Sequence, residues 1–141
     1  MNFNLRVSMV SLMHNNLQAG IDFYKQLELP VTFQVPGKWA EFDLQGVKLF
    51  LYQVDEELPD HYSGLVLHVD DVHKFYDAFK DRITFVTPPT DLEYAYIARI
   101  KDPGNNIIGL VQPTPERVRE KMSAQQEMQE SDCCKDGKCQ C

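Results

Sequence analysis

The strongest constraint on the fold is that one pattern of predicted elements occurs twice along the chain. Each copy begins with an apolar strand, continues into an amphipathic helix, and ends with three strands separated by polar turns. Aligning the two helices at Leu17 and Val72 also aligns Met9 with Gly64, at the same offset of 55 residues. An internal duplication of this length predicts two β-α-β-β-β modules that bury their sheets against a shared partner.

In the first copy, Asn15 or Asn16 is expected to cap the helix, and Pro30 follows its end. The apolar face of this helix is predicted to carry Leu17, Ile21, Tyr24 and Leu27, with Phe23 beside them. The strands of this copy are predicted at 5–13, 32–35, 39–44 and 47–54.

In the second copy, Asp70 or Asp71 is expected to cap the helix, and a proline-rich turn is expected after residue 87. The apolar face of the second helix is predicted to carry Val72, Phe75, Tyr76 and Phe79. The strands are predicted at 63–69, 83–87, 93–100 and 107–112. The chain is thus expected to consist of a first module (1–54), a connector (55–62), a second module (63–112), a polar helical extension (113–131) and a cysteine-rich tail (132–141).

Period-two alternation assigns the strand residues to two faces. One face is aliphatic and suited to receive the helices; it carries Leu49, Leu51, Leu65, Leu67, Ile108 and Leu110. The opposite face is expected to show Phe50, Tyr52, Gly64, Val66, His68, Ile107, Gly109 and Val111. A face that mixes aromatic rings, a histidine and glycines suits either a ligand pocket or a second core against a partner subunit, and both interpretations stay open.

Charge and cysteine distribution exclude several functional classes. The formal charge is −7, and residues 1–112 hold fifteen acidic against nine basic side chains, which argues against nucleic acid as a partner and is compatible with a cationic ligand. No apolar run is long enough to span a membrane, and residues 7–13 lack the features of a signal peptide, so a cytoplasmic location is expected. All four cysteines fall in the last nine residues, so the domain is not a disulfide scaffold.

Paired modules, the Phe23-Tyr24 pair in the first helix and the sequence DPGNNIIGLVQ at 102–112 together resemble the vicinal-oxygen-chelate superfamily, which includes glyoxalases, bleomycin-resistance proteins and extradiol dioxygenases. The resemblance covers roughly residues 5–112. It implies an α+β fold in which two modules form a U-shaped mixed sheet around a groove, with the helices outside and the chain assembled as a homodimer.

The resemblance also implies where a groove metal would be held. The four ligand positions of metal-dependent members correspond here to Met9, Phe50, Gly64 and Gly109. None of these side chains offers the nitrogen or hard oxygen that a divalent catalytic metal requires, so a groove without metal is expected. A substitute set would have to come from the four histidines; the sequence places His73 on a helix facing away from the groove, and His14 and His61 in connectors. His68 is a lone strand histidine.

The metal-free branch resembles bleomycin-resistance proteins, which sequester a drug without chemistry. The sequence therefore predicts a non-catalytic protein whose groove binds a small cationic or aromatic molecule. The expected groove residues are Met9, Ser11, Trp39, Phe50, Tyr52, Val66, His68, Tyr94, Tyr96 and Gly109. An enzymatic alternative would use His68, Glu41 or Tyr52 for acid–base catalysis, but nothing in the sequence places a nucleophile beside a base.

The end of the chain supports a second hypothesis of a different class. Residues 116–130 form a predicted polar helix with a thin apolar stripe of Val118, Met122 and Met128. Four thiols follow within a short stretch: Cys133, Cys134, Cys139 and Cys141. Thiolates are soft ligands suited to Zn²⁺, Cu(I) or a metalloid, so the protein is alternatively a metal- or metalloid-handling protein that acts through its tail. A disordered, redox-active tail remains the competing interpretation.

Overall fold

The computed structural model describes residues 2–135, which form eight strands and three helices. The elements of the first module are β1 (Met9–His14), α1 (Leu17–Gln26), β2 (Val31–Val35), β3 (Trp39–Asp43) and β4 (Lys48–Gln53). Those of the second are β5 (His61–His68), α2 (Val72–Phe79), β6 (Thr84–Asp91), β7 (Ala95–Lys101) and β8 (Asn106–Pro113). The last element, α3 (Pro115–Lys135), follows the second module.

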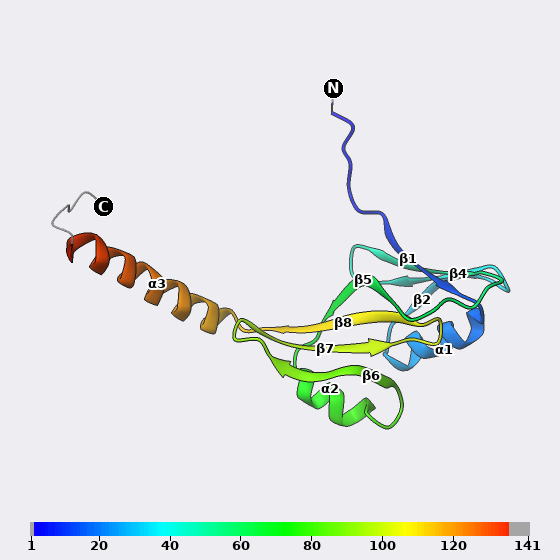
Figure 1. Cartoon of the computed structure of the whole chain (residues 1–141). Helices are drawn as coiled ribbons and strands as arrows, with labels where there is room; N and C mark the ends of the chain where they lie inside the picture. The colour runs from blue at the N-terminus through cyan, green and yellow to red at the C-terminus, as the bar shows by residue number, and fades with distance from the viewer. Residues whose placement is uncertain (1, 136–141) are drawn as a thin grey trace.

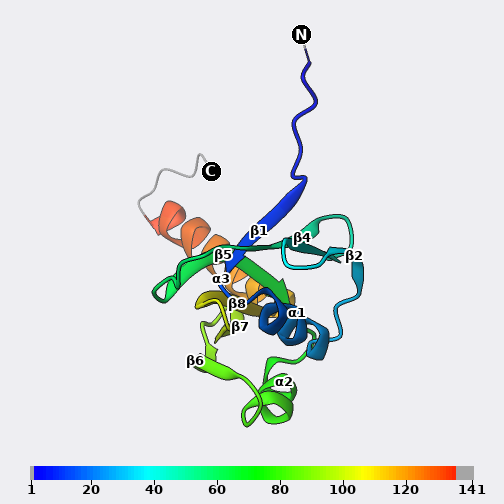
Figure 2. The ribbon, with the colours of Figure 1, turned by 90° about the vertical axis from the view of Figure 1, so that its right-hand side faces the viewer.

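Each module folds into a four-stranded mixed sheet with the same topology. The strand order is β1-β4-β3-β2 in the first sheet and β5-β8-β7-β6 in the second. In each sheet the first and last strands of the module pair in parallel, and the other neighbours pair antiparallel. The repeated order confirms the predicted α+β fold of two β-α-β-β-β modules, with α1 and α2 on the outside of their sheets (Figures 1 and 2).

The helix caps resolve both sequence alternatives. Asn16 caps α1 by accepting a hydrogen bond from the backbone N–H of Ala19 at 3.2 Å. Asp71 caps α2 by accepting one from the backbone N–H of Lys74 at 3.1 Å. Short polar caps of this kind satisfy backbone donors that have no partner within the first helical turn.

A second contact at each helix start repeats between the modules and was not expected from the sequence. The side-chain carbonyl of Gln53, at the end of β4, accepts from the N–H of Leu17 at 3.0 Å. The side-chain carbonyl of Gln112, near the end of β8, accepts from the N–H of Val72 at 3.0 Å. The last strand of each module thus fixes the position of that module's helix.

The hydrophobic core lies between each helix and the aliphatic face of its sheet, as the alternation predicts. Tyr24, Phe42, Leu49, Leu51 and Ile108 are fully buried. Burial of such side chains stabilises a fold by about 1.5–3 kcal/mol each, so this layer holds each helix against its sheet. Because side chains alternate along a strand, the opposite face of each sheet, which we call the open face, carries the remaining strand residues.

Two segments differ from the predicted boundaries. β6 continues through Pro88 and Pro89, where the sequence predicts a turn. This is possible because β6 is an edge strand, where a missing backbone N–H leaves no sheet partner unsatisfied, and its register shifts between Thr87 and Thr90. Residues 2–8 belong to no strand and lead away from the body of the protein (Figure 1).

Helix α3 is attached to the second module at its beginning and leads away from it (Figure 1). Arg117 forms an ion pair with Asp91 at 3.0 Å, and Lys121 pairs with Glu93. The same two cations lie over the rings of Tyr96 and Tyr94, respectively. Within the described part of the chain, no helix is both long and apolar enough to cross a membrane.

Candidate functional site

The open face of the first sheet contains a hollow of about 580 Å³. Three adjacent elements supply its walls: β1, the turn between β2 and β3 with the start of β3, and the end of β4. The residues that line this hollow, called the aromatic hollow below, are Ser11, Gly37, Lys38, Trp39, Phe50, Tyr52 and Gln53. Four of the residues predicted for the groove are therefore brought together: Ser11, Trp39, Phe50 and Tyr52.

The three aromatic rings of the hollow form a row. The ring centroids of Trp39 and Phe50 are 6.1 Å apart, and those of Phe50 and Tyr52 are 5.9 Å apart with an angle of 29° between the ring planes. Sheet register produces the row, because Trp39 lies opposite Tyr52 on the neighbouring strand and Phe50 follows on the same face. A row of ring faces and edges beside open space offers a stacking surface for a planar molecule.

The polar groups of the hollow differ in their availability. Both ends of the Gln53 amide are engaged: its carbonyl accepts from Leu17, and its amino group donates to the backbone carbonyls of Asn15 and Val54. Among residues 2–126, whose side chains the structure describes, the Ser11 hydroxyl, the Trp39 indole N–H and the Tyr52 hydroxyl have no hydrogen-bond partner. These groups remain free to contact a ligand.

Two predicted groove residues lie elsewhere. Tyr96 is on the helix side of β7. Its ring centroid is 5.2 Å from that of His73 on α2 in a T-shaped arrangement, and the guanidinium group of Arg117 lies over the same tyrosine ring. Its position follows from alternation, because Tyr96 shares its face with the buried residues Ala98 and Ile100. Tyr94 lies in the turn between β6 and β7, against Lys121 of α3. The prediction for these two tyrosines is therefore corrected.

The other predicted groove residues are not part of the aromatic hollow. Met9 lies at the start of β1 and is 40% exposed, while Val66 and His68 are on the open face of β5. His68 is paired with Asp70 at 3.1 Å and its side chain is largely exposed. Gly109 lies opposite Val66 in the sheet, and a Cβ at this glycine would be 3.2 Å from a methyl group of Val66. Glycine here leaves room for that side chain.

Strand register refines the comparison with a metal site. On the open face, Phe50 is paired with Ser11, and Gly109 is paired with Val66. The residues beside Phe50 and Gly109 are therefore two positions further along β1 and β5 than Met9 and Gly64, which the sequence comparison had indicated. Gly64 instead adopts φ +83° between Tyr62 and Val66, where the register of β5 shifts. Neither set of residues fits a divalent metal, and the side chains that the structure describes, in residues 2–126, form no cluster of three or more His, Cys, Asp or Glu that could hold one.

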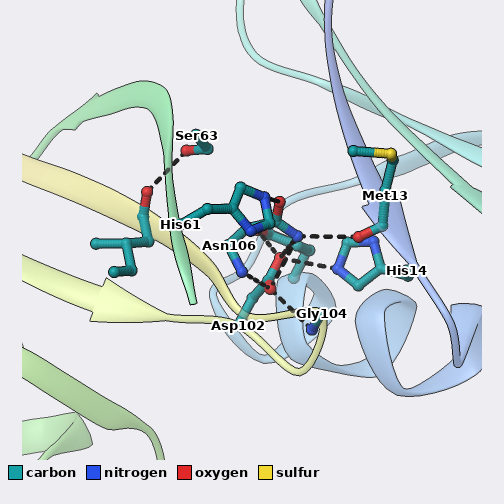
Figure 3. Close-up of polar contacts among 9 residues, drawn as sticks. Met13, His14, His61, Ser63, Asp102, Gly104 and Asn106 are labelled. Atoms are coloured by element: carbon teal, nitrogen blue, oxygen red, sulfur yellow. Dashed lines mark hydrogen bonds and ion pairs between the residues drawn. The ribbon is translucent and has the colours of Figure 1, made fainter. Parts of the chain in front are cut away.

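A buried polar network joins the two modules (Figure 3). His14 ends β1 and donates from Nε2 to Asp102 Oδ2 at 2.8 Å, and the hydroxyl of Tyr24 donates to the same oxygen at 2.7 Å. Asp102 Oδ1 accepts from the backbone N–H groups of Gly104 and Asn106, both at 2.9 Å. The Asn106 amino group also donates to the carbonyl of Met13 at 3.0 Å. The network thus links β1 and α1 to the turn before β8.

The network corrects the placement of two histidines. His14 is a strand residue with 1% exposure, not part of a connector, because its ring is held inside the junction between the modules. His61 begins β5, and its two ring nitrogens lie 2.8 Å from the Pro59 carbonyl and from Asn106 Oδ1. Both histidines are therefore occupied in a structural network and do not face the aromatic hollow.

Ionisation in the network follows from burial and hydrogen bonding. Burial opposes ionisation of Asp102, but hydrogen bonds from His14 and Tyr24 and the charge of His14 outweigh it, so the pKa of Asp102 is below its usual 3.8. Burial, followed by the Asp102 charge and the hydrogen bond to it, raises the pKa of Tyr24 well above 10. Asp102 is thus a carboxylate and Tyr24 a neutral donor at neutral pH.

Two glycines allow His14 to occupy this junction. A Cβ at Gly20 of α1 would be 2.7 Å from His14 Cδ2, and a Cβ at Gly104 would be 2.6 Å from the Met13 carbonyl and 2.7 Å from the same ring carbon. Sequence reasoning missed this arrangement because His14 and Asp102 are 88 positions apart. The only local signals were a histidine directly after an apolar strand and the glycine in DPGNN.

The thiol site predicted at the end of the chain is described only in part. Cys133 and Cys134 belong to the last turns of α3, whereas Cys139 and Cys141 lie outside the described residues. The predicted thin apolar stripe of this helix includes Met122, which is 57% exposed.

Comparison with known proteins identifies the fold. The sequence model of the family described as Glyoxalase/Bleomycin resistance protein/Dioxygenase superfamily matches residues 6–110. No curated protein gives a significant match. Among solved structures, the antibiotic-binding protein TnmS3 from Streptomyces sp. CB03234 is similar, with 24% identity, a TM-score of 0.67, and coverage of 81% of this chain and 100% of that one.

Two further structures show the same fold at lower identity. A genomically encoded fosfomycin resistance protein from Listeria monocytogenes has 15% identity and a TM-score of 0.67, with 86% of this chain and 99% of that one covered. The bleomycin-binding protein from Streptomyces verticillus, solved with copper(II)-bleomycin, has 11% identity and a TM-score of 0.63, with 80% and 100% covered. With the duplicated topology and the family match over most of the chain, the protein belongs to the glyoxalase/bleomycin resistance protein/dioxygenase superfamily.

Proposed function

We propose that this protein binds a small aromatic molecule in the aromatic hollow and sequesters it without metal chemistry. The observation that carries the proposal is the row of Trp39, Phe50 and Tyr52 beside a hollow of about 580 Å³. This volume falls within the range of ligand pockets in proteins. The bleomycin-binding and antibiotic-binding proteins among its structural neighbours support a role in small-molecule binding.

The side chains available for catalysis support the same proposal. Glu41 is on the open face near Lys48, at 3.9 Å, and His68 belongs to the other module. Tyr52 lines the hollow, but neither Glu41 nor His68 does. An acid–base reaction needs both groups within reach of one substrate, and of these three residues Tyr52 alone lines the hollow.

Tryptophan fluorescence tests the proposal directly, because Trp39 is the single tryptophan of the chain. We expect planar aromatic drugs to change Trp39 emission in a saturable manner. Phe50→Ala should weaken binding about tenfold by removing the central ring of the row. Phe33→Ala is the matched control, because Phe33 is 53% exposed and does not line the hollow. A flat response across a broad panel, or equal losses in both variants, would contradict the proposal.

We further propose that the protein acts as a homodimer. The sequence left open whether the face opposite the helices packs against a partner subunit as a second core. Large apolar side chains are exposed on this open face in the second sheet, and also on the N-terminal segment. They are Tyr62, Val66, Val86, Phe3, Leu5 and Val7. Exposed apolar groups of this extent favour association. The solution mass, measured over a range of protein concentrations, should be twice the chain mass of 16.3 kDa; a constant monomer mass would contradict the proposal.

The alternative function uses the C-terminal thiols. Helix α3 places Cys133 and Cys134 about 30 Å along the chain from its anchored start, so a thiol site there would act separately from the aromatic hollow. Truncation after Glu130 separates the two functions. If the tail holds a soft metal or metalloid, the truncated protein should lose binding of Zn²⁺, Cu(I) or As(III) and keep aromatic binding. Equal metal stoichiometry in both forms would exclude this alternative.

A further inference from the structure

We infer that the ligand of the aromatic hollow is a planar aromatic anion, such as an aromatic carboxylate, and that Lys38 selects its charge. This inference rests on the proposed function and adds the chemical class of the ligand. It differs from the cationic ligand that the overall acidic charge suggests, because the charge that acts on a ligand is the one that lines the site. Lys38 is the single charged residue among those lining the hollow.

The backbone of Lys38 is fixed at the rim of the hollow. Its N–H donates to the carbonyl of Val35 at 3.0 Å, which closes the turn between β2 and β3. Its carbonyl accepts from the N–H of Gln53 at 2.9 Å, which ties the turn to the end of β4. The next residue along the chain is Trp39, so the ammonium group is carried on a fixed backbone directly beside the aromatic row.

The ammonium group of Lys38 is available for a ligand. With the side chains of residues 2–126, Lys38 forms no ion pair, and its own side chain is exposed. By contrast, the other lysine on this sheet face, Lys48, lies 3.9 Å from the carboxylate of Glu41. A lysine without an intramolecular partner can form a charge-assisted hydrogen bond to a carboxylate or phosphate oxygen.

The remaining available groups favour the same ligand chemistry. The Trp39 indole N–H and the Lys38 ammonium can only donate hydrogen bonds, and the hydroxyls of Ser11 and Tyr52 can donate or accept. No carboxylate lines the hollow to balance these donors. A ligand rich in acceptor oxygens therefore satisfies this set better than an organic cation, which would leave the donors unpaired and lie beside a like charge.

The acidic residues that dominate the net charge do not line the hollow. Glu41 lies opposite Phe50 on the open face, but its carboxylate is 3.9 Å from the ammonium group of Lys48. Asp43 accepts a hydrogen bond from the backbone N–H of Gln45 in the following turn. Asp55, Glu56 and Glu57 follow β4 in the connector and do not line the hollow. Their effect on a bound ligand is screened by solvent and salt, whereas a direct contact with Lys38 is screened less.

Three probes of matched shape separate the charge preference from aromatic binding itself. Naphthoate, naphthalenemethanol and naphthylmethylammonium share one ring system and differ in charge. Calorimetry gives their affinities, and the indole N–H signal of Trp39 in an NMR spectrum reports whether each probe reaches the hollow. We expect naphthoate to bind about fivefold tighter than the alcohol at low salt, and the ammonium compound to bind more weakly than the alcohol. The preference should shrink as salt is added.

Variants at two lysines assign the preference. Lys38→Gln should reduce the difference in affinity between naphthoate and the alcohol to within about twofold. Lys80→Gln is the charge-matched control, because Lys80 caps the far end of α2 in the other module. This control should retain the wild-type preference, which excludes an effect of net charge alone.

The possible outcomes distinguish two claims, aromatic binding in the hollow and the selection of an anion by Lys38. Anion preference that depends on Lys38 supports the inference. Equal affinities for the three probes with a shifted Trp39 signal, a preference for the ammonium compound, or an anion preference that survives Lys38→Gln would overturn the charge assignment while aromatic binding stands. No binding of any probe, with an unchanged Trp39 signal, would overturn aromatic binding and this inference together.

Discussion

At the scale of single residues, several glycines of this protein make room for a neighbouring side chain. Gly20 and Gly104 both lie against the His14 ring, and Gly109 lies against the side chain of Val66. In the sequence analysis, Gly109 was interpreted as the position where metal-dependent members of the family carry a carboxylate ligand. The structure adds a packing reason, because the side chain of Val66 occupies the space beside it.

These contacts predict different costs for glycine-to-alanine substitutions. Gly20→Ala and Gly104→Ala should each lower the free energy of unfolding by roughly 1–3 kcal/mol, because the new methyl group overlaps the His14 ring and, at Gly104, a backbone carbonyl. Gly109→Ala should change it by less than about 1 kcal/mol, since Val66 can move slightly and alanine loses less entropy on folding. Urea unfolding measures all three. Equal costs at the three sites would contradict the packing argument.

Asp102 predicts how stability depends on pH. Folding lowers the pKa of Asp102 below 3.8. The carboxylate therefore stabilises the folded state fully at pH values above the pKa that Asp102 has in the unfolded chain. This contribution is lost as the pH falls through the lower pKa of the folded state. Asp102→Asn should therefore cost about 3 kcal/mol near pH 7 and flatten the decline in stability below about pH 4.

The control for this prediction is an exposed acid on α1. Among the side chains that the structure describes, Asp22 is bonded to that of Gln18 alone, so Asp22→Asn should leave the pH profile nearly unchanged. Urea unfolding of the wild type and both variants across the acidic range measures the effect. A profile for Asp102→Asn that parallels the wild type would show that another group controls acid stability.

At the scale of elements, periodicity was sufficient to place every strand and helix of the two modules, because helices and strands alternate apolar residues with different periods. The ends were less accessible. Pro88 and Pro89 indicate a turn by local chemistry, but their place at a sheet edge permits a strand. Tyr96 was predicted to face the groove. Alternation along β7 instead places it on the same face as the buried Ala98 and Ile100.

The glutamines that contact the helix starts give a prediction at this scale. Gln53 forms three hydrogen bonds, to Leu17, Asn15 and Val54, whereas Gln112 is bonded to Val72. Gln53→Ala should lower the free energy of unfolding by about 2 kcal/mol and Gln112→Ala by about 1 kcal/mol, in proportion to the hydrogen bonds lost. Thermal and urea unfolding check the order. A larger loss at Gln112 would contradict it.

At the scale of the whole molecule, two modules with one topology have different open faces. Aligning Gln53 with Gln112 places Phe50 on Gly109 and Tyr52 on Val111, so the second module lacks the aromatic row. The duplicated fold was predictable because each module repeats the same local pattern. The network that joins the modules was not predictable, because His14 and Tyr24 of the first module meet Asp102 of the second only when both modules have folded.

Native mass spectrometry of the chain truncated after Glu130 tests the central claim most directly. The truncated protein lacks the C-terminal thiols, so any retained metal must be held by the two modules. We predict that protein purified without chelator carries no stoichiometric divalent metal and gains the mass of one aromatic probe per hollow, a gain that Phe50→Ala reduces. One tightly held Zn²⁺, Mn²⁺ or Fe²⁺ per chain would contradict the claim and indicate an enzyme.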